Sequence, residues 1–408
     1  MKYSPNAAYW IAVQAGVTPL GVGWPGSAKT QSAYSFARAM NRKLYTLIGS
    51  IRDPADFGIP FPVNPDVDHI VADTKCPLGN GKVAYFALAA PKWAADTWNG
   101  DKWIILCDEL TDCPPAVRSG MLRFIAENVV GDLALPEDTW KCALCNPVAV
   151  ATNGTELEPA MANRLCHIQW TMDWDAWDDG LSNGLKFPAP TFPRVPDDWR
   201  NQIPAVANMV RAFRSHRPDA FHPPLDAEGT VSCDRDRMSG PWPSPRSWTM
   251  AIQTRAAAIA AGCDRGILLS LLQGCVGHGA LEYDEWENNL DLPDPKKSLD
   301  KAEAALKAGK EVPYVHPDRP DKVIAHLCAV VNQVVGDLND TKRYNKSRWE
   351  AAVGIFHQAS KYECDLAISC IRPLFRLGDG KAVRPQGAAL DQEFQNLIWP
   401  IIEQVSRK

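Results

Sequence analysis

Short, continuous apolar runs alternate with stretches of helical spacing along the first 170 residues. The first apolar run ends at residues 20–22. The others cover residues 44–48, 103–107, 148–152 and 166–170. Runs of this length without polar alternation are typical of strands that are buried on both faces. Between them, apolar residues recur at i, i+3, i+4 and i+7, as in residues 33–40 and 117–129, and residues 7–13 form a further short helix. This alternation predicts an α/β fold with a parallel sheet, whose carboxyl edge carries the site.

From about residue 201 onward the pattern is helical. The predicted helices cover residues 203–214, 247–261, 265–278, 322–338, 347–360, 365–377 and 389–405. We therefore predict four parts, which are a nucleotide-binding core at 1–175, a linker at 176–200, a helical lid at 201–282 and a C-terminal helical extension at 283–408. Within the core, residues 53–101 are rich in Pro, Gly and Asp and are interpreted as an insertion.

Composition narrows the class of protein. The chain has 408 residues, is 46% hydrophobic and carries a net charge of −5, which argues against a dedicated nucleic-acid binder. No apolar run approaches the ~20 residues that a membrane span needs. The first residues lack the apolar segment of an export signal, so we expect a cytoplasmic protein with reduced cysteines. Cys142 and Cys145 form a C-x-x-C without a second pair, so no metal site is expected there.

Residues 23–30 read Gly-Trp-Pro-Gly-Ser-Ala-Lys-Thr, after an apolar run and before a helix. Glycines let backbone N–H groups turn inward around an anion, and the helix N-terminus adds positive partial charge. Lys29 is expected to contact the β and γ phosphates, and Thr30 to hold Mg²⁺. Ala28 replaces the usual glycine, which is tolerable only with a negative φ. The alternative is an ordinary glycine turn. The expected nucleotide contacts are Gly23, Trp24, Pro25, Gly26, Ser27, Ala28, Lys29, Thr30 and Gln31.

Asp108 and Glu109 directly follow the apolar run at 103–107. An aspartate at the end of a buried strand, beside a phosphate loop, is placed to hold Mg²⁺, and the next glutamate can polarise the attacking water. Taken alone, the pair would be interpreted as a solvated pair at the start of a helix, where acidic residues suit the helix dipole. The phosphate-loop motif upstream favours an ATP site.

Five more side chains are candidates for this site. Asn153 ends the predicted strand at 148–152, where an amide can orient water, although a turn asparagine before Gly154 is the alternative. Arg164 precedes the last predicted strand and alone would be a surface arginine. Arg246 begins a predicted helix, against the helix dipole, which a bound anion would explain. Tyr9 and Trp10 are candidate neighbours of the adenine.

In this order, these motifs resemble the AAA+ ATPases, and more closely their MoxR-type branch. The resemblance spans about residues 15–280 and is carried by residues 23–30, 53–60, 108–110 with 114–117, 131–136, 162–165 and 244–248. It implies an AAA+ phosphate-loop core followed by an all-α lid. It also implies that Lys29 and Thr30 are the Walker A pair, that Asp108 and Glu109 are Walker B with Glu109 as catalytic base, that Asn153 is sensor 1, Arg164 the arginine finger and Arg246 sensor 2.

The resemblance further implies Mg·ATP bound between subunits of a ring, most simply a hexamer, that remodels a protein partner as a chaperone does. A von Willebrand A-domain protein is the partner expected for this branch. Two departures from the family are Leu165, where Phe is usual, and Thr152 before Asn153. One alternative is an ATP-gated switch or scaffold that assembles without remodelling. Another is a DNA motor, which the acidic composition disfavours.

Overall fold

A five-stranded parallel sheet organises the first half of the chain. The structure is a computed structural model and describes residues 5–63, 85–151, 154–223, 238–341, 345–375 and 394–398. The strands follow the order β2-β5-β8-β1-β9, with bounds β1 Pro19–Val22, β2 Lys43–Ile48, β5 Trp103–Asp108, β8 Trp140–Cys145 and β9 Cys166–Gln169. Ile48 pairs with Asp108, and Val22 with Cys145 and Gln169. This register aligns the carboxyl ends of the strands along one edge.

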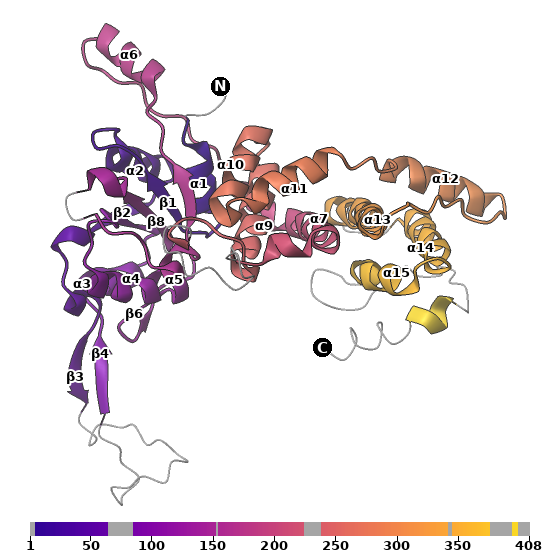
Figure 1. Cartoon of the computed structure of the whole chain (residues 1–408), viewed down its shortest axis with the longest axis horizontal. Helices are drawn as coiled ribbons and strands as arrows, with labels where there is room; N and C mark the ends of the chain where they lie inside the picture. The colour runs from indigo at the N-terminus through magenta and orange to yellow at the C-terminus, as the bar shows by residue number, and fades with distance from the viewer. Residues whose placement is uncertain are drawn as a thin grey trace, which may run out of the picture. The chain divides into compact units, whose positions relative to one another are not determined.

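Helices cover both faces of this sheet, as Figure 1 shows. One face carries α1 (Ala7–Gln14), α2 (Lys29–Ala39), α9 (Pro245–Ala260) and α10 (Arg265–Val276), and the other carries α3 (Lys92–Ala95) and α4 (Pro115–Glu127). Strand residues alternate between the two layers. Ile105 and Cys107 pack in the cluster that contains Met121 of α4. On the opposite face, Trp10 stacks on Phe36 with ring centroids 4.3 Å apart.

The predicted α/β class, with a parallel sheet and additional helical parts, is confirmed by this arrangement. One predicted strand is wrong. Residues 148–150 form a 3-10 turn after Pro147, and the sheet instead contains β8, Trp140–Cys145. The sequence of β8 mixes Lys141 and Trp140 with cysteines and so hides its apolar character, although its last four residues are buried.

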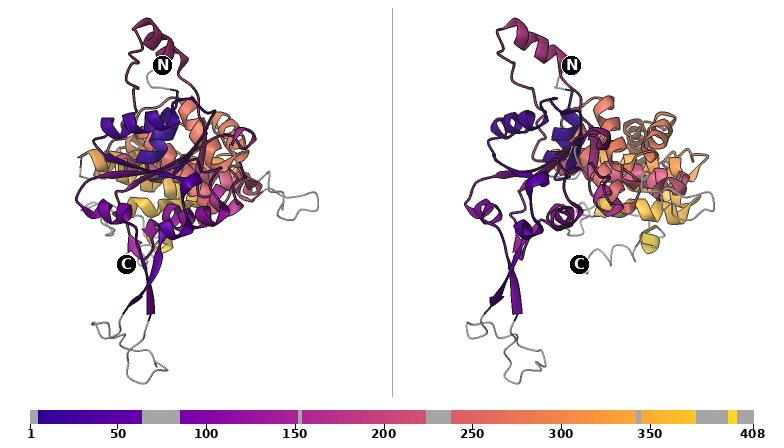
Figure 2. Two further views of the ribbon diagram at one scale, coloured as in Figure 1. Left: turned by 90° about the vertical axis from the view of Figure 1, so that its left-hand side faces the viewer. Right: turned by 60° about the vertical axis from the view of Figure 1, so that its left-hand side comes forward.

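The predicted insertion at 53–101 contains regular structure. Strands β3 (Ile59–Val63) and β4 (Tyr85–Ala89) pair antiparallel in a ribbon that leaves the core, as Figure 2 shows from two further directions. Two shorter strands, β6 (Val129–Val130) and β7 (Leu133–Ala134), follow α4, and α5 (Pro159–Ala162) precedes β9. The next segment, predicted to be a linker, contains helix α6 (Trp174–Ser182).

The chain forms two compact units. The first comprises Met1–Val195 with Pro223–Gly277, and the second Pro196–His222 with His278–Lys408. Helix α7 (Ile203–His216), expected in the lid, packs in the second unit with α11 (Gly279–Asn288), α12 (Pro295–Lys307), α13 (Pro320–Thr341), α14 (Lys346–Ser360) and α15 (Cys364–Ile371). The division into core, linker, lid and extension stays a prediction. Within the described ranges, none of the helices combines the length and the apolar character that crossing a bilayer requires.

Candidate functional site

The glycine-rich loop between β1 and α2 lies at the carboxyl edge of the sheet. The Gly23 N–H donates to the Cys145 carbonyl at 3.2 Å, which fixes the start of the loop to β8. A Cβ on Gly23 would lie 2.6 Å from the Cβ of Trp170, so no other residue fits there unless the Trp170 side chain moves. Gly26 has a φ of +79°, which glycine adopts without strain. The loop conformation therefore depends on both glycines.

Ala28 occupies the left-handed region, with φ 58° and ψ 25°, at the N-cap of α2. The sequence-based expectation of a negative φ at this position is therefore wrong. The carbonyl of Ala28 accepts the Ser32 N–H at 2.9 Å, so the residue closes the loop and begins the helix in one step. A side chain in this conformation costs roughly 1–2 kcal/mol, which the surrounding loop must offset.

Lys29 is buried, and its ammonium group contacts three oxygen atoms. It donates to the carbonyls of Gly23 at 2.6 Å and Trp24 at 2.9 Å, and to Asn146 Oδ1 at 3.0 Å. Burial lowers the pKa of Lys29, while the charge of Asp108 opposes this shift. A buried cation with a depressed pKa gains from an anion, so this loop is electrostatically suited to phosphate.

Thr30 and Asp108 come together from α2 and β5. The Thr30 hydroxyl donates to Asp108 Oδ2 at 2.7 Å, and Asp108 Oδ1 accepts the Glu109 N–H at 3.0 Å. Burial raises the pKa of Asp108, whereas its bonds to Thr30 and Glu109 lower it. A hydroxyl and a carboxylate beside a lysine form the hard-oxygen donor set that Mg²⁺ prefers when it also binds phosphate. The residues present therefore fit Mg·ATP.

Glu109 follows with a φ of +59°, a strained conformation for this residue type. Its carboxylate accepts a hydrogen bond from the Ser50 hydroxyl. Ser50 lies in the 3-10 turn Gly49–Ile51 that directly follows β2. The sharp turn after Asp108 thus aims the Glu109 side chain at the end of the neighbouring strand, along the carboxyl edge of the sheet.

Asn146 is a site residue that the sequence analysis missed. It follows β8, the strand between β5 and β1, and its side chain bonds to Lys29. The backbone carbonyl of Asn146 accepts the Thr111 hydroxyl at 3.0 Å, which holds the residue in place. Asn153 lies outside the described residues, so its assigned role stays a prediction. A correct assignment of β8 would have identified Asn146 as the amide at the strand end.

Arg164 and Arg246 lie near each other. Burial lowers the pKa of Arg164, and the positive charge of Arg246 lowers it further. Asn163 fixes this arrangement, because its amide donates to the Trp242 carbonyl at 3.0 Å and accepts from the Ser244 hydroxyl at 2.8 Å. Ser244 is also the N-cap of α9, whose second residue is Arg246. Both arginines therefore project from elements joined by one asparagine.

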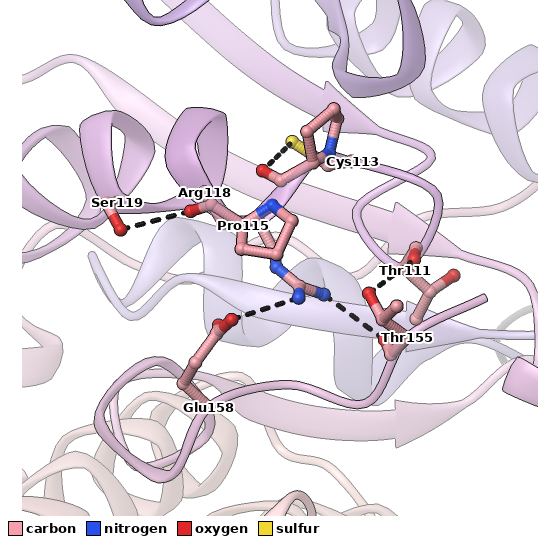
Figure 3. Close-up of polar contacts among 8 residues, drawn as sticks. Thr111, Cys113, Pro115, Arg118, Ser119, Thr155 and Glu158 are labelled. Atoms are coloured by element: carbon pink, nitrogen blue, oxygen red, sulfur yellow. Dashed lines mark hydrogen bonds and ion pairs between the residues drawn. The ribbon is translucent and has the colours of Figure 1, made fainter. Parts of the chain in front are cut away.

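A buried arginine of α4 contacts the segment that precedes α5, as Figure 3 shows. Arg118 of α4 donates to Glu158 Oε1 at 2.9 Å and to the Thr155 carbonyl at 3.2 Å. The Thr155 N–H in turn donates to the Thr111 carbonyl at 3.1 Å. The segment that leads to α5 and Arg164 is thus held against α4 and the loop after Glu109.

Two aromatic residues that were predicted to contact the adenine lie in the core instead. Tyr9 and Trp10 have no exposed surface. The Tyr9 hydroxyl donates to the Ala143 carbonyl at 2.9 Å, and Trp10 packs between rings of the same layer. They help to seat α1 on the sheet. Without movement of α1, neither ring can reach a base.

Comparisons with known proteins find only weak structural similarity to this chain. No model of a known protein family matches the chain, and no curated protein matches it in sequence. A solved candidate ATPase of Cytophaga hutchinsonii is 16% identical with a TM-score of 0.41, over 66% of this chain and 79% of that one. A full-length MCM homologue of Methanopyrus kandleri is 11% identical with a TM-score of 0.32, over 66% of this chain and 55% of that one. With scores this low, function is inferred from the residues of this chain.

Proposed function

We propose that this protein is an AAA+ ATPase that binds and hydrolyses Mg·ATP. The observation that carries the proposal is the contact of 2.7 Å between Thr30 Oγ1 and Asp108 Oδ2, beside the buried ammonium of Lys29. Residues 78 positions apart meet there because β1 and β5 end at the same edge of the sheet. The order of motifs along the chain, which resembles the MoxR-type branch, supports the same assignment.

Each residue then has a separate task. Lys29 and the loop N–H groups bind the phosphates, and Thr30 with Asp108 would hold Mg²⁺, which supplies charge neutralisation between the phosphate oxygens. Glu109 accepts a proton from the attacking water, and Ser50 orients the Glu109 carboxylate beforehand. We give the orienting amide role to Asn146, because it bonds to Lys29 at the strand end.

We further propose that Arg164 and Arg246 act together on the nucleotide of a neighbouring subunit. Their proximity and their shared tie to Asn163 support a common target for both side chains. Among the described residues, the Arg164 Nε is buried and has no hydrogen-bond partner, so it retains a free donor. A ring, most simply a hexamer, would give each site such a pair. An arginine supplied by a neighbour raises turnover by roughly 10³–10⁵ in related phosphate-loop enzymes.

Nucleotide binding tests the first proposal. Lys29→Ala is expected to abolish binding of a fluorescent ATP analogue with Mg²⁺. Lys43→Ala is the matched control, since Lys43 forms an exposed ion pair with Asp101 on the same unit. Equal affinities of Lys29→Ala and the unmodified protein would exclude the assigned site.

Turnover tests the shared site. Glu109→Gln and Arg164→Ala are each expected to bind ATP and to lose steady-state hydrolysis. In a mixture of the two variants, an intact Glu109 and an intact Arg164 can meet at one interface, so partial activity should return. A mixture without activity, or full activity of Arg164→Ala alone, would refute action between subunits.

The use of this energy is proposed from the sequence resemblance. We propose that the ring remodels a protein partner, and that the partner carries a von Willebrand A domain. Such a protein is expected to co-purify with the ring in the presence of ATP. The Glu109→Gln variant is expected to release this partner more slowly than the unmodified protein does. Assembly that responds identically to ATP and to a non-hydrolysable analogue, without any change in the partner, would favour a switch.

A further inference from the structure

An exposed arm leaves the first unit between β9 and Pro193. It comprises residues 173–191, with helix α6 and a returning segment, and it stands away from the core in Figures 1 and 2. Gly180 is its single buried residue. Five large apolar side chains are nonetheless exposed on it, led by Trp174 at 63% and Leu185 at 68%, with Trp177, Leu181 and Phe187. Such a concentration on one protruding element marks an interaction surface.

The base of the arm is fixed firmly to α1 and α2. Asn6 exchanges two hydrogen bonds with the backbone of Thr171, at 2.8 and 2.9 Å. On the returning side, Gln14 Nε2 donates to the Pro193 carbonyl at 2.9 Å. Phe192 packs edge-on against Trp10 and Phe36, with ring centroids 5.6 and 5.2 Å apart. Both ends are therefore anchored, and the arm between them is held out from the core.

The arm also has internal order. Asp173 caps α6 through the Ala176 N–H at 3.1 Å. Phe187 folds back over Gly180 so closely that a Cβ there would lie 2.1 Å from the Phe187 ring. A helix of nine residues is too short to be stable in water by itself, because nucleation of a helix is unfavourable. Its stability should therefore increase when its apolar side chains are covered.

The backbone strain at Leu185 and the exposed apolar area of the arm also indicate an interaction surface. Leu185 has a φ of +67°, an outlier for a bulky residue, yet its side chain is largely exposed, so the folded chain gains little from it. Three aromatic side chains that are about half exposed offer roughly 300 Å² of apolar surface. That is more than a third of the ~800 Å² that one partner contributes to a stable interface.

The position and the charge of the arm indicate which partner binds it. Trp170, just before the arm, donates from Nε1 to the Ser27 carbonyl of the phosphate loop at 3.1 Å, so the arm starts beside the nucleotide edge. Four aspartates lie on the arm, Asp173, Asp175, Asp178 and Asp179, against Lys186. A second copy of this chain would present the basic pair Arg164 and Arg246 towards that same edge, as the shared site requires. An anionic bilayer or a nucleic acid would repel the aspartates.

We propose that the arm docks on the neighbouring copy of this chain and forms part of the contact between subunits. The proposal rests on the proposed function, since it assigns a role to the arm in the same ring. The apolar side chains bind the neighbouring surface, and the aspartates favour its basic border. The arm then acts as a tether that keeps each pair of subunits in register around the shared nucleotide.

Assembly tests this proposal. Leu185→Asn removes an exposed apolar side chain and places a residue that tolerates positive φ, so the arm should keep its fold. The double variant Trp174→Ser with Trp177→Ser removes both indoles. Leu281→Asn is the matched control, because Leu281 is 57% exposed on α11. Sedimentation velocity with Mg²⁺ and a non-hydrolysable ATP analogue should show at least tenfold weaker assembly of both arm variants, with nucleotide affinity unchanged and the control assembling normally.

The outcomes separate the two proposals. If the arm variants assemble as the unmodified protein does, the arm proposal is overturned and the ring stands. If the unmodified protein stays monomeric with nucleotide, the ring and the arm proposal both fall. Hydrogen exchange gives a direct readout, because amides of Trp174–Ser182 should become protected on assembly. Unchanged exchange in the assembled protein would refute docking.

Discussion

Lys29 shows how tightly the site is built at the scale of single residues. Its ammonium donates to two loop carbonyls and to Asn146, so phosphate must replace at least one of these partners. Asn146 can then turn its amide N–H₂ towards a phosphate oxygen or a water. Asn153 was assigned to this task from the sequence because the preceding strand was placed at the wrong residues. The amide that contacts the lysine could not be found without the correct strand.

Substitution of the two asparagines separates their roles. Asn146→Ala is expected to lower the rate of ATP hydrolysis on the order of 10²-fold, as loss of one preorganised polar contact does elsewhere. Asn153→Ala should leave turnover near that of the unmodified protein. Steady-state phosphate release at saturating ATP measures both variants. A larger loss for Asn153→Ala than for Asn146→Ala would instead assign the orienting role to Asn153.

Ala28 permits a second test at this scale. Its φ of 58° is one that glycine adopts freely, whereas alanine pays about 1–2 kcal/mol in strain. Ala28→Gly relieves this strain but increases the freedom of the unfolded chain by roughly 0.5–1 kcal/mol. The free energy of unfolding should therefore rise by about 0.5 kcal/mol, with nucleotide affinity retained. Urea unfolding measures the change, and a loss of more than about 1 kcal/mol would contradict the assignment of strain.

Among the elements, those with a single clear signal were predicted correctly. Strand β5 was identified by its unbroken apolar run before Asp108, and α2 by its helical spacing after the loop. Strand β8 was missed because Lys141 and the two cysteines of a C-x-x-C obscure its burial. The sequence around α6 predicts a linker because it is rich in Trp, Asp, Gly and Pro. Its tryptophans were the signal that could have revealed an organised arm.

Strand β8 also predicts a dependence of stability on pH. Burial raises the pKa of Cys142 from 9.0 to about 12. The folded state therefore keeps this proton when the unfolded chain has lost it. Stability from this thiol is fully present below about pH 9 and is lost as pH rises towards 12. The slope per titrating group is about 1.4 kcal/mol per pH unit. Urea unfolding between pH 9 and 11 should show a shallower slope for Cys142→Ala.

Cys263→Ala is the control for that measurement, since Cys263 is half-buried. Cys145, whose pKa is likewise raised to about 12, remains in both variants and contributes equally to them. Equal slopes for Cys142→Ala and the unmodified protein would show that the thiol is accessible to solvent, contrary to its burial.

At the scale of the whole molecule, the second unit is discontinuous in sequence. Helix α7 packs on α13, and an aromatic cluster of Phe213, Tyr283 and Trp286 joins α7 to α11, with Phe213 and Tyr283 centroids 5.2 Å apart. Asp321 at the start of α13 accepts from Trp286 Nε1 at 2.9 Å. These long-range contacts could not be read from local periodicity, which placed α7 in a lid with α9 and α10.

A chain that ends after residue 282 tests this arrangement. It retains α7 but lacks α13, so the buried side chains Val206, Val210 and Phe213 should become exposed. We expect strong binding of a hydrophobic dye and aggregation at micromolar concentration. A chain in which residues 196–222 are also replaced by a Gly/Ser linker should aggregate less. Equal solubility of the two shortened chains would contradict the packing of α7 on α13.

The separation of α7 from α13 has a consequence during synthesis. Helix α7 ends at His216 and α13 begins at Pro320, so about a hundred residues are translated between them. Translation proceeds at roughly 5–20 residues per second. The apolar side chains of α7 therefore stay exposed for on the order of 5–20 s before α13, which covers them, has been synthesised. A nascent chain at that stage exposes apolar surface that chaperones bind, and slower translation of this interval would lengthen the exposure.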